Sequence, residues 1–356
     1  MNATSSEDLI TALTTPDDPR KIPVLYALQV ICTLVGLFVN TFTLAALICI
    51  GRQFSPCIRL LLIHQSWIDS WVCLQGFVLQ VQPYKWKTGA LGFDTFVCHI
   101  WHSQTVFWGC VDISIFGLVM IACERYIATC HPLKHLSITT RSFLIAIACV
   151  TAFTMVILMM PSYFQASMKD GVCTTDFYFT SPGFDKLMSG YPIIIFIVTY
   201  FIPCGLFIFF YGSIIRLLRK RKRQHELGES QIISKANSEI LKTAIVVTLI
   251  FIVSMFFDKW YYVLGNVGVF DYQLNTPVQK VGVFMIVMNS AINPFIYLIF
   301  MSAFRRKFCL WVRNRCRPVA SPYNSNNSQN NSTASEKLMA SYTRGKLVNT
   351  NTVSKV

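Results

Sequence analysis

The amino-acid sequence predicts an all-α membrane protein, a bundle of seven transmembrane helices. Three observations carry this prediction. Of the 356 residues, 53% are hydrophobic and only 13% are charged, whereas soluble domains carry roughly 25% charged residues. The apolar residues gather in seven long runs, and the net charge of +14 is concentrated in every second connection between them. The 28 Phe, 14 Tyr and 7 Trp exclude a disordered chain, which would be poor in aromatic residues.

Each apolar run is close to or above the roughly 18–20 residues that a helix needs to cross a hydrocarbon core. Helices are the only open-ended segments that satisfy every backbone group in lipid. The runs are Val24–Ile50, Leu60–Val81, Val97–Cys123, Phe143–Pro161, Tyr191–Leu218, Ile240–Leu264 and Val281–Phe300. We therefore expect a bundle over residues 23–300. The polar segment 1–22 before it lacks the basic start and apolar centre of a signal peptide.

The charges of the connections predict the orientation. On one side, 51–59, 124–141, 212–243 and 301–356 carry a summed charge of +18. On the other side, 1–22, 82–97, 162–190 and 258–280 carry −2, and Asp69 and Asp112 lie within predicted helices. Because Lys and Arg stay on the cytoplasmic side, we expect a multi-pass protein of the plasma membrane with the N-terminus extracellular and the C-terminus cytoplasmic. The basic excess is then a topology signal, and no nucleic-acid partner is expected.

The predicted extracellular segments carry a glycosylation site and two cysteines. Asn2-Ala3-Thr4 is an N-glycosylation sequon. Of the 13 cysteines, only Cys98 and Cys173 fall on this side, where an oxidising compartment favours a disulfide. Two free thiols are the alternative. The others lie in helices or on the reducing side, where cysteine is an ordinary small apolar residue.

Several polar side chains lie in the middle of the predicted helices, where an ionisable group costs about 2.5–3.5 kcal/mol. Asn289, Asn293 and Tyr297 are four residues apart, which places them on one face of a helix. The set also includes Asn40, Asp69 and Ser114. One carboxylate with several neutral oxygens suits a monovalent cation such as Na⁺. A hydrogen-bond network without an ion is the alternative, and the spacing favours neither.

The third, fifth and seventh runs carry features that allow a helix to change state. Glu124-Arg125-Tyr126 ends the third run, and an adjacent acid and base at a helix end can exchange partners. A simple interfacial anchor is the alternative. Pro203 and Pro294 interrupt the fifth and seventh runs. Such kinks are tolerated where neighbouring side chains satisfy the freed carbonyls, and they are places where a helix can bend.

Taken together, these residues resemble the rhodopsin-like (class A) G-protein-coupled receptors over nearly the whole span from 36 to 309. The matching positions are Gly36, Asn40, Asp69, Trp86, Cys98, Ser114, Glu124-Arg125-Tyr126, His131-Pro132-Leu133, Pro161, Cys173, Pro203, Tyr211, Asn289, Asn293-Pro294-Phe295-Ile296-Tyr297 and Phe304-Arg305-Arg306-Lys307-Phe308. The Glu-Arg-Tyr and Asn-Pro-x-x-Tyr sequences, on the correct two of seven helices, are the specific part of the resemblance.

The resemblance implies the roles of these residues and adds a short amphipathic eighth helix over 301–316 to the seven-transmembrane helix bundle. Glu124 would hold Arg125, which activation would release toward Tyr211 and a heterotrimeric G protein. Asn293, Pro294 and Tyr297 would relay the motion of helix seven, and Cys98–Cys173 would pin the second extracellular loop. Asp69, Ser114, Asn289 and Asn293 would hold an allosteric Na⁺, and no cofactor is required. Cys309 and Cys316 would be palmitoylation sites, and a plain buried thiol is the alternative for Cys316.

Helices three and six depart from the family pattern. Where helix six usually carries Cys-Trp-x-Pro, this chain has Ser254-Met255-Phe256-Phe257. Cys98 lies two residues further from Arg125 than usual, which predicts a bulge near the top of helix three. The acidic residue that often faces Arg125 from helix six is displaced to Glu239, and the usual position holds Asn237.

The ligand class follows from what the helices lack and what the rims carry. His99 to Val111 holds no carboxylate for an amine, and Val281–Phe300 holds no Lys for retinal. Asp112 lies one turn or more too deep for an amine, so we expect its neighbours to satisfy it, with ligand contact as the alternative. The rim residues are Trp86, His102, Trp260, Tyr261 and Lys280. Mixed charge and aromatics favour a neuropeptide or peptide hormone. A lipid or other non-amine small molecule is the alternative, and a membrane aromatic belt explains Trp260 and Tyr261 equally well.

Other protein classes fit less well. A transporter would show repeated halves with matching broken helices, and an enzyme would need metal ligands or a nucleophile pair at one depth. From residue 317 the tail is rich in Asn, Ser and Thr, so we expect a disordered segment over 317–356 with sites for receptor kinases and then arrestin. The terminus Ser354-Lys355-Val356 fits a PDZ-domain partner.

Overall fold

The computed structural model describes residues 23–50, 54–81, 88–169, 172–175, 190–224, 231–270, 276–300 and 302–316. The chain divides into two compact units, 1–308 and 309–356. The predicted glycosylation site Asn2, the rim residue Trp86 and the terminus Ser354-Lys355-Val356 lie outside the described residues, as do the segments 1–22 and 317–356.

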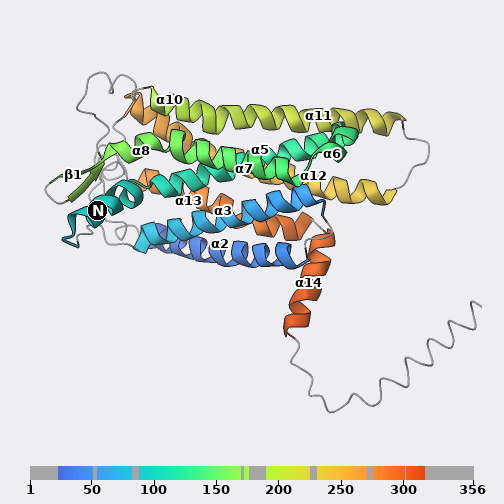
Figure 1. Ribbon diagram of the computed structural model, residues 1–356, viewed down its shortest axis with the longest axis horizontal. Coiled ribbons are helices and arrows are strands. Elements are labelled where there is room, and N and C mark those ends of the chain that lie inside the picture. The colour runs from blue at the N-terminus through green and yellow to red at the C-terminus, as the bar shows by residue number, and fades with distance from the viewer. Residues whose placement is uncertain are drawn as a thin grey trace, which may run out of the picture. The chain divides into compact units, whose positions relative to one another are not determined.

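The described elements are almost all helical. In chain order they are α2 (Pro23–Ile50), α3 (Pro56–Val81), α4 (Leu91–Val97), η3 (Cys98–His102), α5 (Thr105–Cys130), α6 (Pro132–Ser137), α7 (Thr140–Phe153), η4 (Thr154–Leu158), α8 (Met160–Gln165), β1 (Ala166–Lys169), β2 (Val172–Thr175), α10 (Tyr191–Phe196), η5 (Ile197–Phe201), α11 (Ile202–Gln224), α12 (Gln231–Asn266), α13 (Pro277–Phe300) and α14 (Ser302–Cys316). The long helices of the first unit lie side by side (Figure 1).

The protein is a seven-helix membrane bundle. Within the described residues, six helical spans are long and apolar enough to cross a membrane on length and composition alone. The seventh is α3, whose 26 residues include Arg59, His64, Gln65 and Asp69. These polar side chains lower the apolar character of α3, although the helix is long enough to span. The segment is buried among α2, α5 and α13, so its polar side chains face other helices.

The bundle exposes apolar side chains on its outer surface and buries polar side chains among the apolar residues of its interior, unlike a soluble domain. Val24, Ile31 and Phe38 of α2 are between 59% and 70% exposed, whereas Asn40 on the same helix is 0% exposed. In water this apolar surface would be costly, but in a bilayer it contacts lipid tails. Close packing of α2 requires Gly36, where a Cβ atom would lie 2.8 Å from the Ala291 Cβ.

Three of the transmembrane helices contain a π-helical turn. In helix three the turn is η3, followed by Gln104, whose φ of 58° is left-handed. This irregularity accommodates the additional residues between Cys98 and Arg125, where the sequence predicts a bulge. In helix five the turn η5 ends two residues before Pro203 of α11. Proline has no N–H to donate to the preceding turn, and wider turns of this kind occur where the hydrogen-bond ladder is interrupted.

Helices six and seven extend further than the apolar runs predict. α12 has 36 residues and includes Asp258 and Lys259, which the charge sum above counts in the connection 258–280, and each is 4% exposed. α13 begins at Pro277, which places Lys280 within the helix at 8% exposure. Hydropathy misses the first turn of α13 because a charged side chain such as Lys280 lowers the average over its neighbours.

A short antiparallel hairpin lies at one end of the bundle. It is formed by β1 and β2, and Met168 pairs with Cys173. The disulfide Cys98–Cys173 joins this hairpin to η3. We call this the disulfide end, near β1 in Figure 1, and we call the opposite end, near α6, the Glu124 end.

Candidate functional site

The Glu124 end contains a buried ion pair at the end of α5. The guanidinium of Arg125 donates to the carboxylate of its neighbour Glu124 through both Nε and Nη2. Glu124 is 0% exposed and Arg125 is 7% exposed. The two residues are adjacent to the C-terminal turn of α5, which ends at Cys130. A charge pair of this kind is stable only while both partners are present, because removal of one leaves the other buried and unpaired.

A histidine that the sequence analysis did not single out completes this pair. The Nε2 atom of His135, on the short helix α6, lies 3.0 Å from Oε1 of Glu124. Glu124 therefore contacts Arg125 with one carboxylate oxygen and His135 with the other. Tyr126 points elsewhere, with its hydroxyl 3.2 Å from Nε2 of His131 and its ring against Phe210. Only the fold could reveal the His135 contact, because α6 follows a turn at His131 that returns it to α5.

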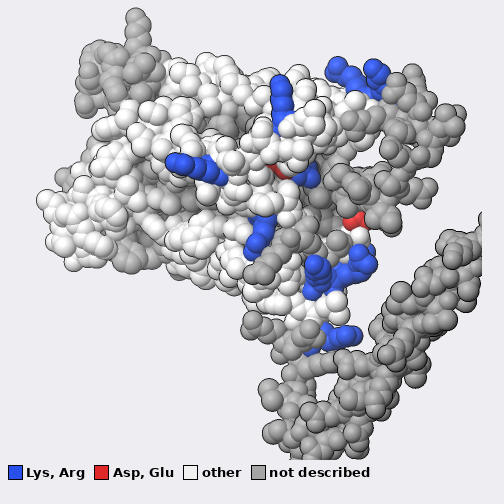
Figure 2. All heavy atoms as spheres, turned by 45° about the vertical axis from the view of Figure 1, so that its right-hand side comes forward, with Lys and Arg blue, Asp and Glu red and all other residues white. Residues whose placement is uncertain are grey.

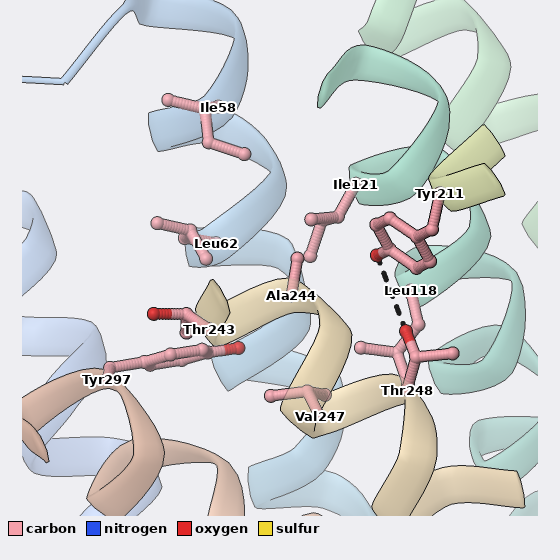
Figure 3. Close-up of a pocket in the computed structure, with 10 residues that line it drawn as sticks. All are labelled: Ile58, Leu62, Leu118, Ile121, Tyr211, Thr243, Ala244, Val247, Thr248 and Tyr297. Carbon is pink, nitrogen blue, oxygen red and sulfur yellow. Dashed lines mark hydrogen bonds between the residues drawn. The ribbon is translucent and has the colours of Figure 1, made fainter. Parts of the chain in front are cut away.

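A small cavity lies beside the ion pair, between α3, α5, α11, α12 and α13. Its volume is about 20 Å³, which is room for about one water. The lining residues are Ile58, Leu62, Leu118, Ile121, Tyr211, Thr243, Ala244, Val247, Thr248 and Tyr297. Figure 3 shows the rings of Tyr211 and Tyr297 reaching the cavity from opposite sides.

The two tyrosines of the cavity differ in their hydrogen bonding. The hydroxyls of Thr248 and Tyr211 are 3.4 Å apart, and both side chains are buried. The hydroxyl of Tyr297 is buried without a hydrogen-bond partner among the described residues. A buried hydroxyl without a partner is costly, so Tyr297 is the group in this cavity that gains most from a new partner. Pro294 is buried one turn before it in α13.

The polar residues of the bundle centre surround Asp69, which is 0% exposed. Its carboxylate accepts hydrogen bonds from the Ser114 hydroxyl at 2.8 Å and from Asn293 Nδ2 at 2.8 Å. Gln65, which the sequence analysis did not include, donates to both Asp69 and Ser114. Asn289 is buried one turn before Asn293. The network thus connects α3, α5 and α13 directly.

This centre contains oxygen atoms that suit a small cation. Three carbonyl oxygens, Oε1 of Gln65 and the Oδ1 atoms of Asn289 and Asn293, are buried without a hydrogen-bond partner among the described residues. Hard cations bind such neutral oxygens together with a carboxylate. The donor set on α3, α5 and α13 therefore fits Na⁺, although the hydrogen bonds to Asp69 satisfy part of its charge without an ion.

The predicted rim residues are distributed over the disulfide end. His102 is half-buried in η3, and Lys280 is buried on α13. The ring of Trp260 packs against Phe196, and its Nε1–H has no hydrogen-bond partner within the described residues. The hydroxyl of Tyr261 lies 3.4 Å from that of Thr276. These side chains come from η3, α12 and α13.

Deeper in the same half lies an ion pair that the sequence analysis did not identify. The Nζ atom of Lys259 lies 3.3 Å from Oδ1 of Asp112, and their side chains are 5% and 2% exposed. Asp112 was expected to be satisfied by its neighbours, and the structure shows that its partner is Lys259 of α12. The signal in the sequence was the presence of one basic residue inside a predicted helix, without any indication of its partner.

The surface of the Glu124 end is basic. The exposed cations in its described part are Lys134, Arg141, Arg216, Arg219, Lys220, Lys242, Arg305, Arg306 and Lys307. On the face that Figure 2 shows, Lys and Arg far outnumber Asp and Glu. Of the predicted palmitoylation sites, Cys309 is exposed on α14, and the side chain of Cys316 lies outside the described residues.

Comparison with known proteins gives a consistent result. The family model described as 7 transmembrane receptor (rhodopsin family) matches residues 39–297. The chain is 22% identical to rhodopsin of Gallus gallus over 81% of its own length and 80% of that protein. It is 25% identical to the green-sensitive opsin of Gallus gallus, over 76% of this chain and 74% of the opsin. Identity to dopamine receptor 3 of Caenorhabditis briggsae is 27%, over 42% of this chain and 23% of that receptor.

Proposed function

The chain belongs to the rhodopsin family of seven-transmembrane receptors, and on this premise we propose that it binds an extracellular peptide and activates a heterotrimeric G protein through Arg125. The family makes it a G-protein-coupled receptor and not an enzyme. The observation that carries the mechanism is the buried Glu124–Arg125 pair beside the cavity of Tyr211 and Tyr297.

In the proposed mechanism, breaking the Glu124–Arg125 pair opens the Glu124 end. The bond from Arg125 to Glu124 lies within one helix, so it holds the guanidinium back rather than joining two helices. When the pair breaks, Arg125 can extend toward Tyr211, and the partnerless hydroxyl of Tyr297 gains a hydrogen bond in the same cavity. Both changes favour a state in which α12 has moved away from α5. Such coupling typically amounts to about 1–3 kcal/mol.

The proposed orientation places the Glu124 end in the cytoplasm and the disulfide end outside the cell, in the plasma membrane. The basic surface of the Glu124 end supports this, because Lys and Arg accumulate on the cytoplasmic side and attract anionic lipid. Phosphorylation of the C-terminal tail, followed by arrestin binding, belongs to the same proposal. So do a PDZ-domain partner, Asn2 glycosylation, and palmitoylation at Cys309 and Cys316.

The proposal of a peptide ligand rests on the disulfide end. Similarity to opsins does not extend to the chromophore, because Val281–Phe300 of α13 contains no Lys to bind retinal. Similarity to a dopamine receptor does not extend to its ligand, because His99–Val111 contains no carboxylate. Aromatic and basic side chains from α12, α13 and η3 remain at this end. A lipid or other small molecule is the second candidate.

We also propose an allosteric Na⁺ bound by Asp69, Ser114, Asn289 and Asn293. The unpartnered oxygens of Asn289 and Asn293 support it, and Gln65 joins the set through its contacts with Asp69 and Ser114. The cation would supply charge compensation to Asp69 while agonist is absent.

The experiment that tests the proposed function is a screen of a peptide library in cells, with calcium and cyclic AMP measured together. Activation by at least one peptide is expected, and the response should disappear when Arg125 is replaced. Activation by lipids but by no peptide would favour the second candidate. Substrate flux without any G-protein response would indicate a transporter and contradict the proposal.

A further inference from the structure

Three charged side chains lie together in the half of the bundle nearer the disulfide, and the switch described above uses none of them. They are Asp112 of α5 and the neighbours Asp258 and Lys259 of α12. Their exposed fractions are 1%, 4% and 4%. Charged groups at this depth are expensive and are commonly found at functional sites. We call these three residues the charged cluster.

Within the cluster, Lys259 joins two helices. Its Nζ atom donates to Oδ1 of Asp112 at 3.3 Å and lies 5.7 Å from the centre of the Trp108 ring. Asp112 and Trp108 both belong to α5. The contact therefore ties α12 to α5, one turn beyond Met255, where the family usually places the Trp that this chain lacks. The ion pair therefore connects helices three and six one turn away from the position where the usual aromatic side chain is absent.

Asp258 is the remaining member of the cluster. Its carboxylate lies against α13, because a Cβ atom on Gly282 would be 2.9 Å from its Oδ1. Lys259 attracts it and Asp112 repels it, yet among the described residues no hydrogen bond to Asp258 is present. The absence of a side chain at Gly282 leaves the space that this carboxylate occupies. Asp258 is thus a buried anion whose neighbouring cation already binds another carboxylate.

The charge balance of the cluster identifies what it lacks. Two carboxylates and one ammonium leave a net charge of −1 in the bundle interior. An added cation would produce two ion pairs and leave no charge uncompensated. An added anion that took Lys259 would leave two buried carboxylates without a partner, which is the most costly arrangement. The cluster therefore selects for a positive group on the ligand.

We propose that the charged cluster recognises one ammonium or guanidinium group of the agonist, and that its arrival releases the Asp112–Lys259 link between α5 and α12. This inference deepens the proposed function and depends on it. The cation pairs with Asp112, and Lys259 transfers to Asp258 on its own helix. Every charge is paired before and after the exchange except the single anion that the ligand neutralises. α12 is then free to move.

The first test needs no ligand, because two chemically identical substitutions have opposite expected effects. Asp112→Asn removes the α5 partner, so Lys259 turns to Asp258 and basal nucleotide exchange on the G protein rises about three- to tenfold. Asp258→Asn leaves Lys259 only Asp112, so basal exchange falls below that of the wild type. Asp94→Asn, a buried aspartate outside the cluster, is the matched control and should leave exchange unchanged. Exchange is normalised to receptor at the surface through an N-terminal epitope tag.

A double variant that exchanges the charges of Asp112 and Lys259 controls for single variants that fail to fold. The pair Asp112→Lys with Lys259→Asp restores the link and should return basal exchange to within twofold of the wild type. Equal effects of Asp112→Asn and Asp258→Asn would overturn the inference. So would a rise that the charge exchange does not reverse.

The second test identifies the ligand group with defined probes. Amidated peptides with a free amino terminus and one arginine are compared with N-acetylated citrulline analogues of the same sequence, and a panel of simple monoamines is run beside them. Cationic members should activate, and Asp258→Asn should lower their potency at least tenfold. The inference would be overturned if the neutral analogues were as potent as the cationic peptides, or if no cationic probe activated the receptor. Response to monoamines alone would support the cluster but assign a small ligand.

A further variant, Glu124→Gln, distinguishes failure of this inference from failure of the proposed function. Glu124→Gln frees Arg125 without touching the charged cluster, so it should raise basal exchange if the receptor couples to the G protein. When Glu124→Gln signals and Asp112→Asn does not, only the charged-cluster inference is wrong. When neither signals, the proposed function itself is wrong.

Discussion

Glu239 of α12 binds Ser302, the first residue of α14. Its carboxylate accepts the backbone N–H of Ser302 at 3.0 Å and the Ser302 hydroxyl at 2.8 Å. A carboxylate at a helix start accepts a hydrogen bond from an N–H group that has no intrahelical partner, and its negative charge is attracted by the positive end of the helix dipole. The acid that the sequence analysis found displaced from Arg125 therefore has another partner, and it joins helix six to the start of helix eight.

Breaking this link should make α12 easier to move. Glu239→Ala removes the acceptor, whereas Ser302→Ala removes only the hydroxyl donor. We expect basal nucleotide exchange to rise about tenfold for Glu239→Ala and less for Ser302→Ala, because a hydrogen bond to a charged group contributes about 1.5–3 kcal/mol. Exchange by purified receptor with G protein measures both. Equal basal rates in wild type and Glu239→Ala would show that the contact is only a helix cap.

The packing of α2 supplies a prediction about stability. At Gly36 an added Cβ atom would lie 2.6 Å from Cys73 Sγ and 2.8 Å from Ala291 Cβ, so Gly36→Ala forces α2 away from α3 and α13. We expect a loss of about 1–3 kcal/mol and reduced surface expression. Gly205→Ala is the matched control, because nothing lies within 4 Å of its Cβ position. In thermal unfolding measured in detergent, the midpoint temperature should fall for Gly36→Ala and stay at the wild-type value for Gly205→Ala. Equal midpoints for the two variants would contradict the close approach of the helices at Gly36.

The Na⁺ proposal predicts a specific loss of ion sensitivity. Asp69→Ala should abolish the effect of Na⁺ on agonist affinity, because it removes the one carboxylate of the site. Ser70→Ala alters the adjacent residue, whose hydroxyl donates to the Ser66 carbonyl and to no other group within the described residues, and should keep that effect. Agonist binding measured in Na⁺ and in N-methylglucamine at equal ionic strength provides the comparison. Retained Na⁺ sensitivity in Asp69→Ala would contradict the ion site.

How far the sequence alone could go depends on the range of each interaction. The helices, the basic side of the bundle and the positions of Asp69, Arg125 and Asn293 follow from local composition and spacing. Partners that come from distant elements do not. Nothing near Asp112 indicates Lys259, which is 147 residues away.

Two further examples show the same limit. The bulge in helix three was predictable from its length, but its form as the π-helical turn η3 with Gln104 in a left-handed conformation was not. Asp258 and Lys259 lie near the end of the predicted run Ile240–Leu264, and their charge places them with the connection 258–280 in the charge sum. In the structure α12 continues through them, since Lys259 finds its counterion inside the bundle.

His135 should stabilise the resting arrangement of Glu124. Its Nε2 atom lies 3.0 Å from Oε1 of that carboxylate, so His135→Ala leaves one oxygen of a buried group without its partner. We expect basal exchange to rise about two- to fivefold. Leu136→Ala, next to it on α6 and 82% exposed, is the control. A larger rise for Leu136→Ala than for His135→Ala would remove His135 from the switch.

Guanine-nucleotide exchange by purified receptor and G protein in lipid nanodiscs tests the central claim most directly. If Arg125 is the group that Glu124 holds back, Glu124→Gln should raise basal exchange about five- to tenfold, since about 1.4 kcal/mol corresponds to a factor of ten. The double variant Glu124→Gln with Arg125→Ala should return exchange to the rate without receptor. If Glu124→Gln exchanges no faster than the wild type, or if the double variant remains fast, coupling does not depend on Arg125.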